Sequence, residues 1–294
     1  MLSVANSRLG PRLARLLAGW LPRPITRRLA ACIAGHVARR TNTPLVQALR
    51  INQAVVRGLS VDDPAVAGHV AEVLRQAGNG YVDLYWAIAR GTKALLRTCY
   101  VGPGFGRAMQ TGLRSGRGLI IVGAHMSSFD LLLVSLSSLG YRALGLAFAE
   151  IQGSYPVLNR LRREFGLEVM PISVPALRAA IRRLRQGGLV LTGVDRPVAE
   201  GDLLTFFGRP ARMPTGHARL AVRTGAYILP GVCQADGQGR YRVVGGELID
   251  PRAFGDDEHA ALDLAQHVLA TLEGFVRERP DEWLMFYPVW PDAA

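Results

Sequence analysis

From Gly118 onward, short apolar runs alternate with stretches of helical length, and this alternation limits the fold more than any other feature of the sequence. The first run, residues 119–122, has the length and branched side chains of a buried strand. We expect further strands at 143–148, 167–171, 189–194, 203–207, 227–232 and 241–247, with helices at 131–139, 154–165, 175–186 and 214–224. This alternation predicts an α/β fold: a central, mostly parallel or mixed sheet flanked by helices.

The chain before Gly118 is typical of helices instead. Apolar residues recur at helical spacing at 44–57, 64–76, 81–97 and 105–115. No cluster of residues in these stretches suggests chemistry. We expect residues 1–60 to form basic, membrane-facing amphipathic helices and residues 61–294 to form the α/β domain, with the two parts joined in one continuous domain.

Basic charge is concentrated near the N-terminus. The net charge is +12, but the ten arginines that precede Asp62, the first acidic residue, account for all but +2 of it. Helices are expected at 8–21 and 25–40, and the first carries arginines on one face and Leu and Trp on another. This pattern favours an anionic membrane surface as a partner. The alternatives are a helix docked on its own domain, or nucleic acid, which the lack of a basic strand with interleaved aromatic residues disfavours.

Composition excludes several classes of protein. A chain that is 49% hydrophobic with scattered glycines is not disordered, collagen-like or a coiled coil. Cys32, Cys99 and Cys233 form no CxxC pair, so we expect neither a disulfide framework nor a metal site, and a reducing compartment. No run of 18 uncharged apolar residues predicts a transmembrane helix. The N-terminus is not typical of a secretory signal, and its helical pattern continues without the break expected after a mitochondrial transit peptide.

His125 is the first candidate for chemistry, because it follows directly after the strand expected at 119–122. A neutral imidazole can accept a proton from a hydroxyl, and a carboxylate on its other nitrogen, such as that of Asp130, would fix the tautomer. On one continuous helix the two residues would be about 140° apart, so the pair requires His125 in the turn before the helix. The alternative is structural, since Ser127-x-x-Asp130 resembles a capping box.

The wider pattern resembles the lysophospholipid acyltransferase superfamily, whose His-x4-Asp motif matches His125 and Asp130. Later blocks agree with that family in order and spacing. They are Asn159-x-x-Arg162-x-x-x-Gly166, Ala176-Leu177-Arg178 with Gly187-Gly188, Asp195-Arg196, Phe206-Phe207-Gly208 through Gly216, residues 224–230, and Pro280-Asp281-Glu282-Trp283. The Pro-Glu-Gly-Thr block of the phospholipid-making branch is absent. The chain is more similar to the branch of lipid A lauroyl acyltransferases and phosphatidylinositol mannoside acyltransferases.

This resemblance implies an O-acyltransferase of lipid biosynthesis. It would move a fatty acyl group from acyl-CoA or acyl carrier protein to a hydroxyl of a membrane glycolipid or phospholipid, such as a phosphatidylinositol mannoside or a lipid A precursor. His125 would be the general base without an acyl-enzyme, and the donor would be a substrate, with no cofactor needed. Either Asp130 or Glu200, the latter matched to a glutamate of the mannoside enzymes, would stabilise the imidazolium.

Three arginines in or near the matching blocks are candidates for substrate binding. Arg162, Arg163 and Arg196 would bind phosphates of the donor or acceptor, since a guanidinium can bind phosphate through two N–H groups. From the basic N-terminal helices we expect a peripheral location on the cytoplasmic face of the cell membrane, the inner membrane. A non-catalytic lipid-binding protein of the same fold and a thioesterase remain as alternatives.

Overall fold

The structure is a computed structural model that describes residues 20–148 and 155–293. In this part of the chain, seven strands form one sheet: β1 (Cys99–Val101), β2 (Leu119–Gly123), β3 (Ala143–Ala147), β4 (Glu168–Pro171), β5 (Leu189–Gly193), β8 (Tyr227–Ala235) and β9 (Tyr241–Gly245). The strand order is β1-β9-β8-β2-β5-β3-β4, and every pair is parallel except β8 with β9. The predicted α/β fold with a mostly parallel sheet is confirmed.

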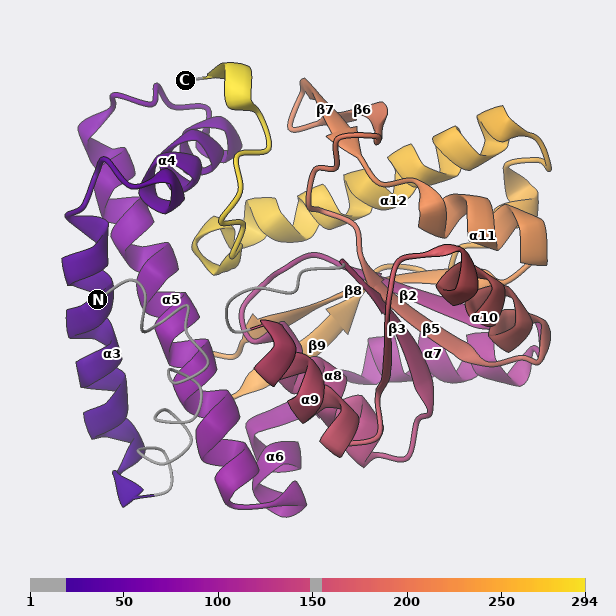
Figure 1. Cartoon of the computed structure of the whole chain (residues 1–294), viewed down its shortest axis with the longest axis horizontal. Coiled ribbons are helices and arrows are strands. Elements are labelled where there is room, and N and C mark those ends of the chain that lie inside the picture. Colours follow the sequence, from indigo (N-terminus) through magenta and orange to yellow (C-terminus); the bar gives the residue numbers. More distant parts are fainter. Residues whose placement is uncertain (1–19, 149–154, 294) are drawn as a thin grey trace.

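Helices cover both faces of this sheet (Figure 1). One face packs against α7 (Pro103–Arg114), α8 (Phe129–Ser138) and α9 (Tyr155–Glu164). The other face packs against α10 (Val174–Arg185), α11 (Gly216–Thr224) and α12 (Glu258–Glu278). A hairpin of β6 (Asp202–Phe206) and β7 (Arg209–Met213) adjoins α12.

Strand β2 shows why the sheet is buried on both sides. Its residues alternate between the two faces: Leu119 and Ile121 pack with the α7–α9 layer, and Ile120 and Val122 with the α10–α12 layer. All four are buried. A strand with two covered faces needs a continuous apolar run, as this sequence has. β2 is also the middle strand of the sheet, so a residue at its carboxyl end has neighbouring strands on both sides.

The N-terminal helices form a group at one end of the sheet (Figure 1). They are α3 (Arg23–Ala38), α4 (Pro44–Arg57) and α5 (Pro64–Ala89), followed by the short α6 (Thr92–Thr98). Thr43 and Asp63 cap the starts of α4 and α5 with their side chains, each before a proline. Helix α3 lies along α5, and a Cβ added at Gly78 of α5 would be 3.2 Å from that of Ala30.

Most predicted elements agree with the structure to within a few residues. The helix predicted at 44–57 coincides with α4, and the strands predicted at 119–122 and 189–194 correspond to β2 and β5. The prediction of two helices at 64–76 and 81–97 is wrong, because α5 continues through Gly78 and Gly80. Gly80 lies where α5 packs closely against Ser128: a Cβ added at Gly80 would be 3.4 Å from the Cβ of that serine.

Strands β1 and β7 and helix α12 had no counterpart among the predicted elements. The helix predicted at 8–21 lies outside the described residues except for its last two. Among the helices that the structure describes, none combines the length and apolar character needed to cross a bilayer.

Candidate functional site

His125 lies just beyond the carboxyl end of β2, between the parallel neighbours β5 and β8. This is the edge where ligands of open α/β sheets usually bind. The turn continues through Ser127, whose φ of 51° lies in the left-handed region, and α8 begins at Phe129. The imidazole is 30% exposed, packs edge-on against Phe129 with ring centroids 5.0 Å apart, and faces a cavity.

The carboxylate paired with His125 belongs to Asp195. Its Oδ1 lies 2.6 Å from Nδ1 of the imidazole, and its Oδ2 accepts the backbone N–H of His125 at 2.8 Å. Asp195 follows β5 as His125 follows β2, so the pairing of these two parallel strands brings both residues together. The indole N–H of Trp283 donates to the same Oδ2 at 2.8 Å.

This pairing shifts the pKa values of both groups. Burial opposes the imidazolium, but attraction to Asp195 outweighs it, so the pKa of His125 is raised. Burial likewise opposes the Asp195 carboxylate, yet its charge pairing with His125 and the N–H groups around it lower its pKa. The ion pair is the favoured state when His125 is protonated. When it is neutral, Nδ1–H faces the carboxylate and Nε2 is the nitrogen that can accept a proton.

The expected contact between Asp130 and His125 is not formed. Asp130 instead binds Arg162 of α9, whose Nε and Nη2 lie 2.8 and 2.7 Å from Oδ1. Both side chains are buried, and Arg162 also donates to Asn159 Oδ1 at 2.8 Å. The acid nearest to His125 in sequence therefore positions a cation.

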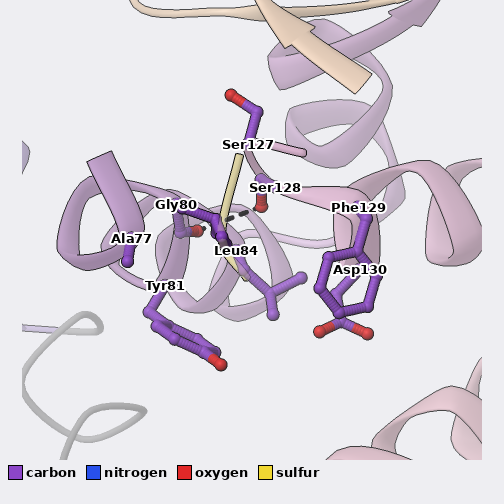
Figure 2. Close-up of a pocket in the computed structure, with 9 residues that line it drawn as sticks. Ala77, Gly80, Tyr81, Leu84, Ser127, Ser128, Phe129 and Asp130 are labelled. Carbon is purple, nitrogen blue, oxygen red and sulfur yellow. Dashed lines mark hydrogen bonds between the residues drawn. The ribbon is translucent and has the colours of Figure 1, made fainter. Parts of the chain in front are cut away.

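The capping box considered for Ser127 and Asp130 is also not what the structure shows. The Ser127 hydroxyl donates to Glu282 Oε2 at 2.9 Å, and Ser128 precedes α8 without a capping bond from its side chain. The Ser128 hydroxyl donates to the Gly80 carbonyl at 3.2 Å. Figure 2 shows this bond and shows the Ser127 hydroxyl and the Asp130 carboxylate pointing in opposite directions.

Of the four other residues predicted for the site, two line the cavity and two do not. Arg162 and Arg196 line the same cavity as His125, and Arg196 is stacked between Phe148 and Tyr287 with its guanidinium carbon 4.7 and 3.7 Å from the two ring centroids. Arg163 and Glu200 are exposed and lie outside the cavity lining. The pairing of Glu200 with His125 that the resemblance implied is not formed, because Asp195 occupies that position.

The cavity beside His125 has a volume of about 990 Å³. One part extends over the ends of β3 and β4 toward α8 and α9, where Leu132, Leu158 and Val169 line it. Another part extends between α3, α5 and the chain near its C-terminus, where Leu29, Leu74 and Phe286 line it. Its lining is mostly apolar, and His125, Arg162 and Arg196 are among the residues that line it. A long apolar chain with an anionic group near its reactive end matches this arrangement.

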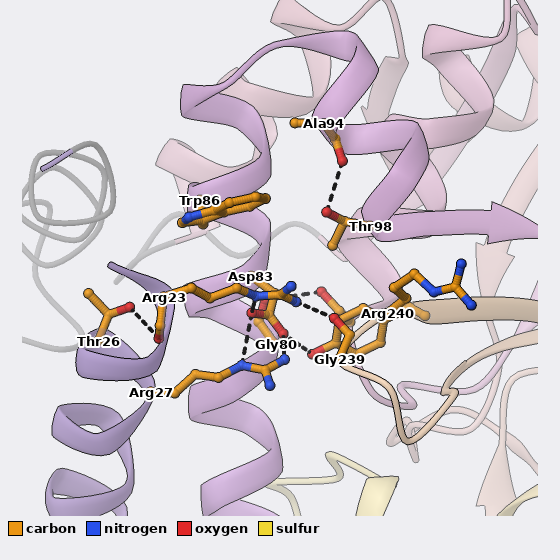
Figure 3. A network of polar contacts seen from close by, with 12 residues as sticks. Arg23, Thr26, Arg27, Gly80, Asp83, Trp86, Ala94, Thr98, Gly239 and Arg240 are labelled. Atoms are coloured by element: carbon orange, nitrogen blue, oxygen red, sulfur yellow. Dashed lines mark hydrogen bonds and ion pairs between the residues drawn. The ribbon is translucent and has the colours of Figure 1, made fainter. Parts of the chain in front are cut away.

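Helix α3 corresponds to the helix expected at 25–40, and its arginines have two different environments. Arg23 and Arg27 bind the fully buried carboxylate of Asp83, to which the Tyr241 hydroxyl also donates at 2.7 Å (Figure 3). These two arginines fix α3 to the body of the protein. Ile25, Leu29 and Ile33, on the opposite side of α3, are each about half exposed. The exposed face of α3 is therefore apolar, next to exposed Arg28.

In the described residues, no group of three His, Cys, Asp or Glu side chains is arranged to hold a metal ion. Sequence reasoning missed Asp195 as the partner of His125. Its position directly after the strand predicted at 189–194 was the available signal, because the ends of neighbouring parallel strands converge. The strand order needed to use that signal came from the structure.

Comparison with known proteins identifies relatives. The family model described as bacterial lipid A biosynthesis acyltransferase matches residues 17–291. A phosphatidylinositol mannoside acyltransferase of Mycobacterium tuberculosis is 31% identical over 141 residues, which cover 44% of this chain and 40% of that protein. The protein of the same name from Mycolicibacterium smegmatis is 27% identical over 185 residues, covering 61% and 59%. The matched part thus spans less than two thirds of these relatives' length.

Proposed function

This chain belongs to the bacterial lipid A biosynthesis acyltransferase family, and we propose that it transfers a fatty acyl group from a thioester donor to a hydroxyl group of a membrane lipid. The observation that carries this proposal is the His125–Asp195 pair at the wall of a large apolar cavity. A base that can accept a proton and a space for a long acyl chain meet there, as this reaction requires.

In the proposed reaction, Nε2 of His125 accepts the proton of the acceptor hydroxyl while the hydroxyl oxygen attacks the thioester carbon. A C–O bond forms, and the carbonyl oxygen becomes an oxyanion. Collapse of this intermediate re-forms the carbonyl and breaks the C–S bond, and the departing thiolate takes the proton from the imidazolium. Asp195 stabilises the imidazolium between the two proton transfers, and no acyl-enzyme is formed.

Arg162 and Arg196 provide positive charge where the reaction has negative charge. Arg162 is buried and bound by Asp130 and Asn159, so it presents a fixed cation near the ring of Phe129, which itself packs against His125. We assign it to the anionic part of a substrate or to the oxyanion. Arg196, stacked between two aromatic rings, is suited to a phosphate of the donor or acceptor.

The names of the relatives suggest the first acceptor to test. Both curated relatives cited above are phosphatidylinositol mannoside acyltransferases, so we propose a mannosylated phosphoinositide as the acceptor. Coenzyme A and acyl carrier protein are both thioester donors that fit the proposed chemistry, and a transfer assay should include each of them.

We further propose that α3 rests on the cytoplasmic surface of an anionic membrane. The support is the row of half-exposed Ile25, Leu29 and Ile33, two of which also line the cavity. Arg28, Arg39 and Arg40 are exposed on and after the same helix and could bind anionic headgroups. In this position the cavity would open toward its lipid substrate.

The test is an acyl-transfer assay with purified protein, a labelled long-chain acyl-CoA or acyl carrier protein, and phosphatidylinositol mannosides or a lipid A precursor. We expect product that depends on the acceptor and is lost in His125→Ala, with exposed His259→Ala as the matched control. Equal transfer by His125→Ala would contradict the mechanism. Fatty acid released at the same rate without acceptor would indicate a thioesterase, and lipid binding without transfer would indicate a non-catalytic protein.

A further inference from the structure

Trp283 lies 158 positions after His125 in the sequence and yet contacts the partner of that histidine. Its indole is fully buried, and its N–H donates to Oδ2 of Asp195 at 2.8 Å. Oδ1 of the same carboxylate faces Nδ1 of His125. The indole therefore binds one oxygen of Asp195 while the imidazole binds the other.

The backbone on either side of Trp283 is bound to the turn that carries His125. The backbone N–H of Leu284 donates to the His125 carbonyl at 2.7 Å, and the N–H of Ser127 donates to the Glu282 carbonyl at 2.7 Å. Met126 and Trp283 form an isolated antiparallel bridge between these bonds. The Trp283 side chain and the His125 backbone are thus placed by the same short pairing.

Helix α4 fixes the C-terminal segment, residues 280–289, from its other side. The Asn52 side chain donates to the carbonyls of Met285 and Tyr287 at 2.9 and 2.8 Å, and its oxygen accepts the N–H of Val289 at 3.0 Å. Gln53 donates to the Pro280 carbonyl at 2.9 Å. Both side chains are fully buried, so the backbone groups of this segment depend on them for hydrogen bonds.

We propose that Trp283 is a positioning residue that orients Asp195, and through it His125, for proton transfer. This role rests on the proposed function for its effect on turnover, but the orientation of the pair can be measured without it. A carboxylate bound at one oxygen only by the His125 backbone N–H can rotate and admit water. The indole N–H restricts that rotation and occupies the place of the water.

Trp290 offers a matched control within the same aromatic cluster. It is buried, stacks on Phe206 with ring centroids 5.6 Å apart, and lies 6.3 Å from the Trp283 ring. Its indole N–H has no hydrogen-bond partner in the described part of the chain. Trp283→Phe and Trp290→Phe therefore remove similar volumes from one cluster, while only the first removes a bond to Asp195.

The experiment compares the wild type, Trp283→Phe and Trp290→Phe by two measurements. Acyl-transfer kinetics should show kcat about tenfold lower in Trp283→Phe with KM within twofold, the size expected when a hydrogen bond to a charged group is lost. NMR titration of the His125 ring, assigned by comparison with His125→Ala, should show its pKa lowered in Trp283→Phe because a rotating, hydrated carboxylate attracts the imidazolium less. Trp290→Phe should match the wild type in both measurements.

The outcomes separate the two proposals. A His125 pKa and a kcat in Trp283→Phe that equal those of Trp290→Phe would overturn the positioning role. A lowered His125 pKa in a protein that transfers no acyl group would support the positioning role and contradict the proposed function. If Trp283→Phe does not fold, a tryptophan analogue with sulfur in place of the indole N–H, incorporated at position 283, keeps the shape of the ring and gives the same comparison.

Discussion

Asp195 binds His125 at two points, with Oδ1 2.6 Å from the ring nitrogen Nδ1 and Oδ2 accepting the backbone N–H at 2.8 Å. A carboxylate held in this way fixes both the direction of the imidazole and its tautomer. Asp195→Asn would keep the shape but lose the charge that stabilises the imidazolium. We expect kcat/KM to fall by about a hundredfold or more, as in other enzymes whose catalytic histidine loses its carboxylate.

Glu200 is the carboxylate that the family resemblance suggested as the partner of His125. Comparing Glu200→Gln with Asp195→Asn tests which of the two carboxylates supports the reaction. Glu200 is exposed and lies outside the cavity, so we expect its replacement to change kcat/KM by less than about twofold. A large loss in Glu200→Gln with a small one in Asp195→Asn would instead support the residue that the family resemblance suggested.

The raised pKa of His125 predicts how activity depends on pH. In the proposed mechanism the imidazole of His125 must be neutral to accept a proton, so kcat/KM should fall as the pH drops through the pKa of His125, which lies above the ordinary value of about 6.5. In Asp195→Asn this limb should move to lower pH, because the attraction that raises the pKa is lost. The same pH dependence of kcat/KM in Asp195→Asn as in the wild type would contradict the pairing.

The contribution of the same pair to stability depends on pH in the opposite sense. Because the folded pKa of His125 is raised above its unfolded value, the stabilisation is complete below about pH 6.5 and is lost as the pH rises through the folded pKa. As the pH rises through the folded pKa of His125, the protein should thus gain activity and lose this part of its stability. Rate measurements and denaturant unfolding at the same pH values can check this.

The contrast between Asp130 and Asp195 shows what the sequence could and could not predict. Strands, most helices and the position of His125 follow from apolar runs and their spacing, which are local properties. The partner of His125 depends on which strands are neighbours, and Asp195 lies 70 residues away. Asp130 is closer in sequence, but it binds Arg162 of α9. Local spacing therefore pointed to His125 but not to the carboxylate that binds it, and the contact between Trp283 and Asp195 came from the structure alone.

The Asp130–Arg162 pair should behave as one energetic unit. Both side chains are buried, so removing either charge leaves the other without compensation. We expect Asp130→Asn and Arg162→Gln each to lower the free energy of unfolding, with the double variant losing less than the sum by about 1–3 kcal/mol. Additive losses in this double-mutant cycle would contradict the pairing.

The imidazole of His125 lies so close to Gly193 that a side chain at this position would contact it. A Cβ at this residue would lie 3.0 Å from Cε1 of His125, so Gly193→Ala should displace the ring while the strand remains. A small misplacement of a catalytic group lowers rates strongly, and we expect kcat/KM to fall by about tenfold to a hundredfold. Gly104→Ala, where a Cβ would meet nothing within 4 Å, is the control and should retain activity. Equal activities of the two variants would show that the ring can shift without cost.

His217, at the start of α11, should make the fold sensitive to acid. Burial lowers its pKa to about 4, against a smaller opposing effect of the Pro214 carbonyl. In the unfolded chain this histidine binds a proton near pH 6.5. The free energy of unfolding should therefore be unaffected by His217 above that pH and should fall by about 3 kcal/mol as the pH drops toward 4. His217→Leu should remove this part of the pH dependence, whereas exposed His259→Gln should keep it. Urea unfolding between pH 4 and 6.5 gives the slopes, and the same slope in His217→Leu as in the wild type would assign the acid sensitivity to other groups.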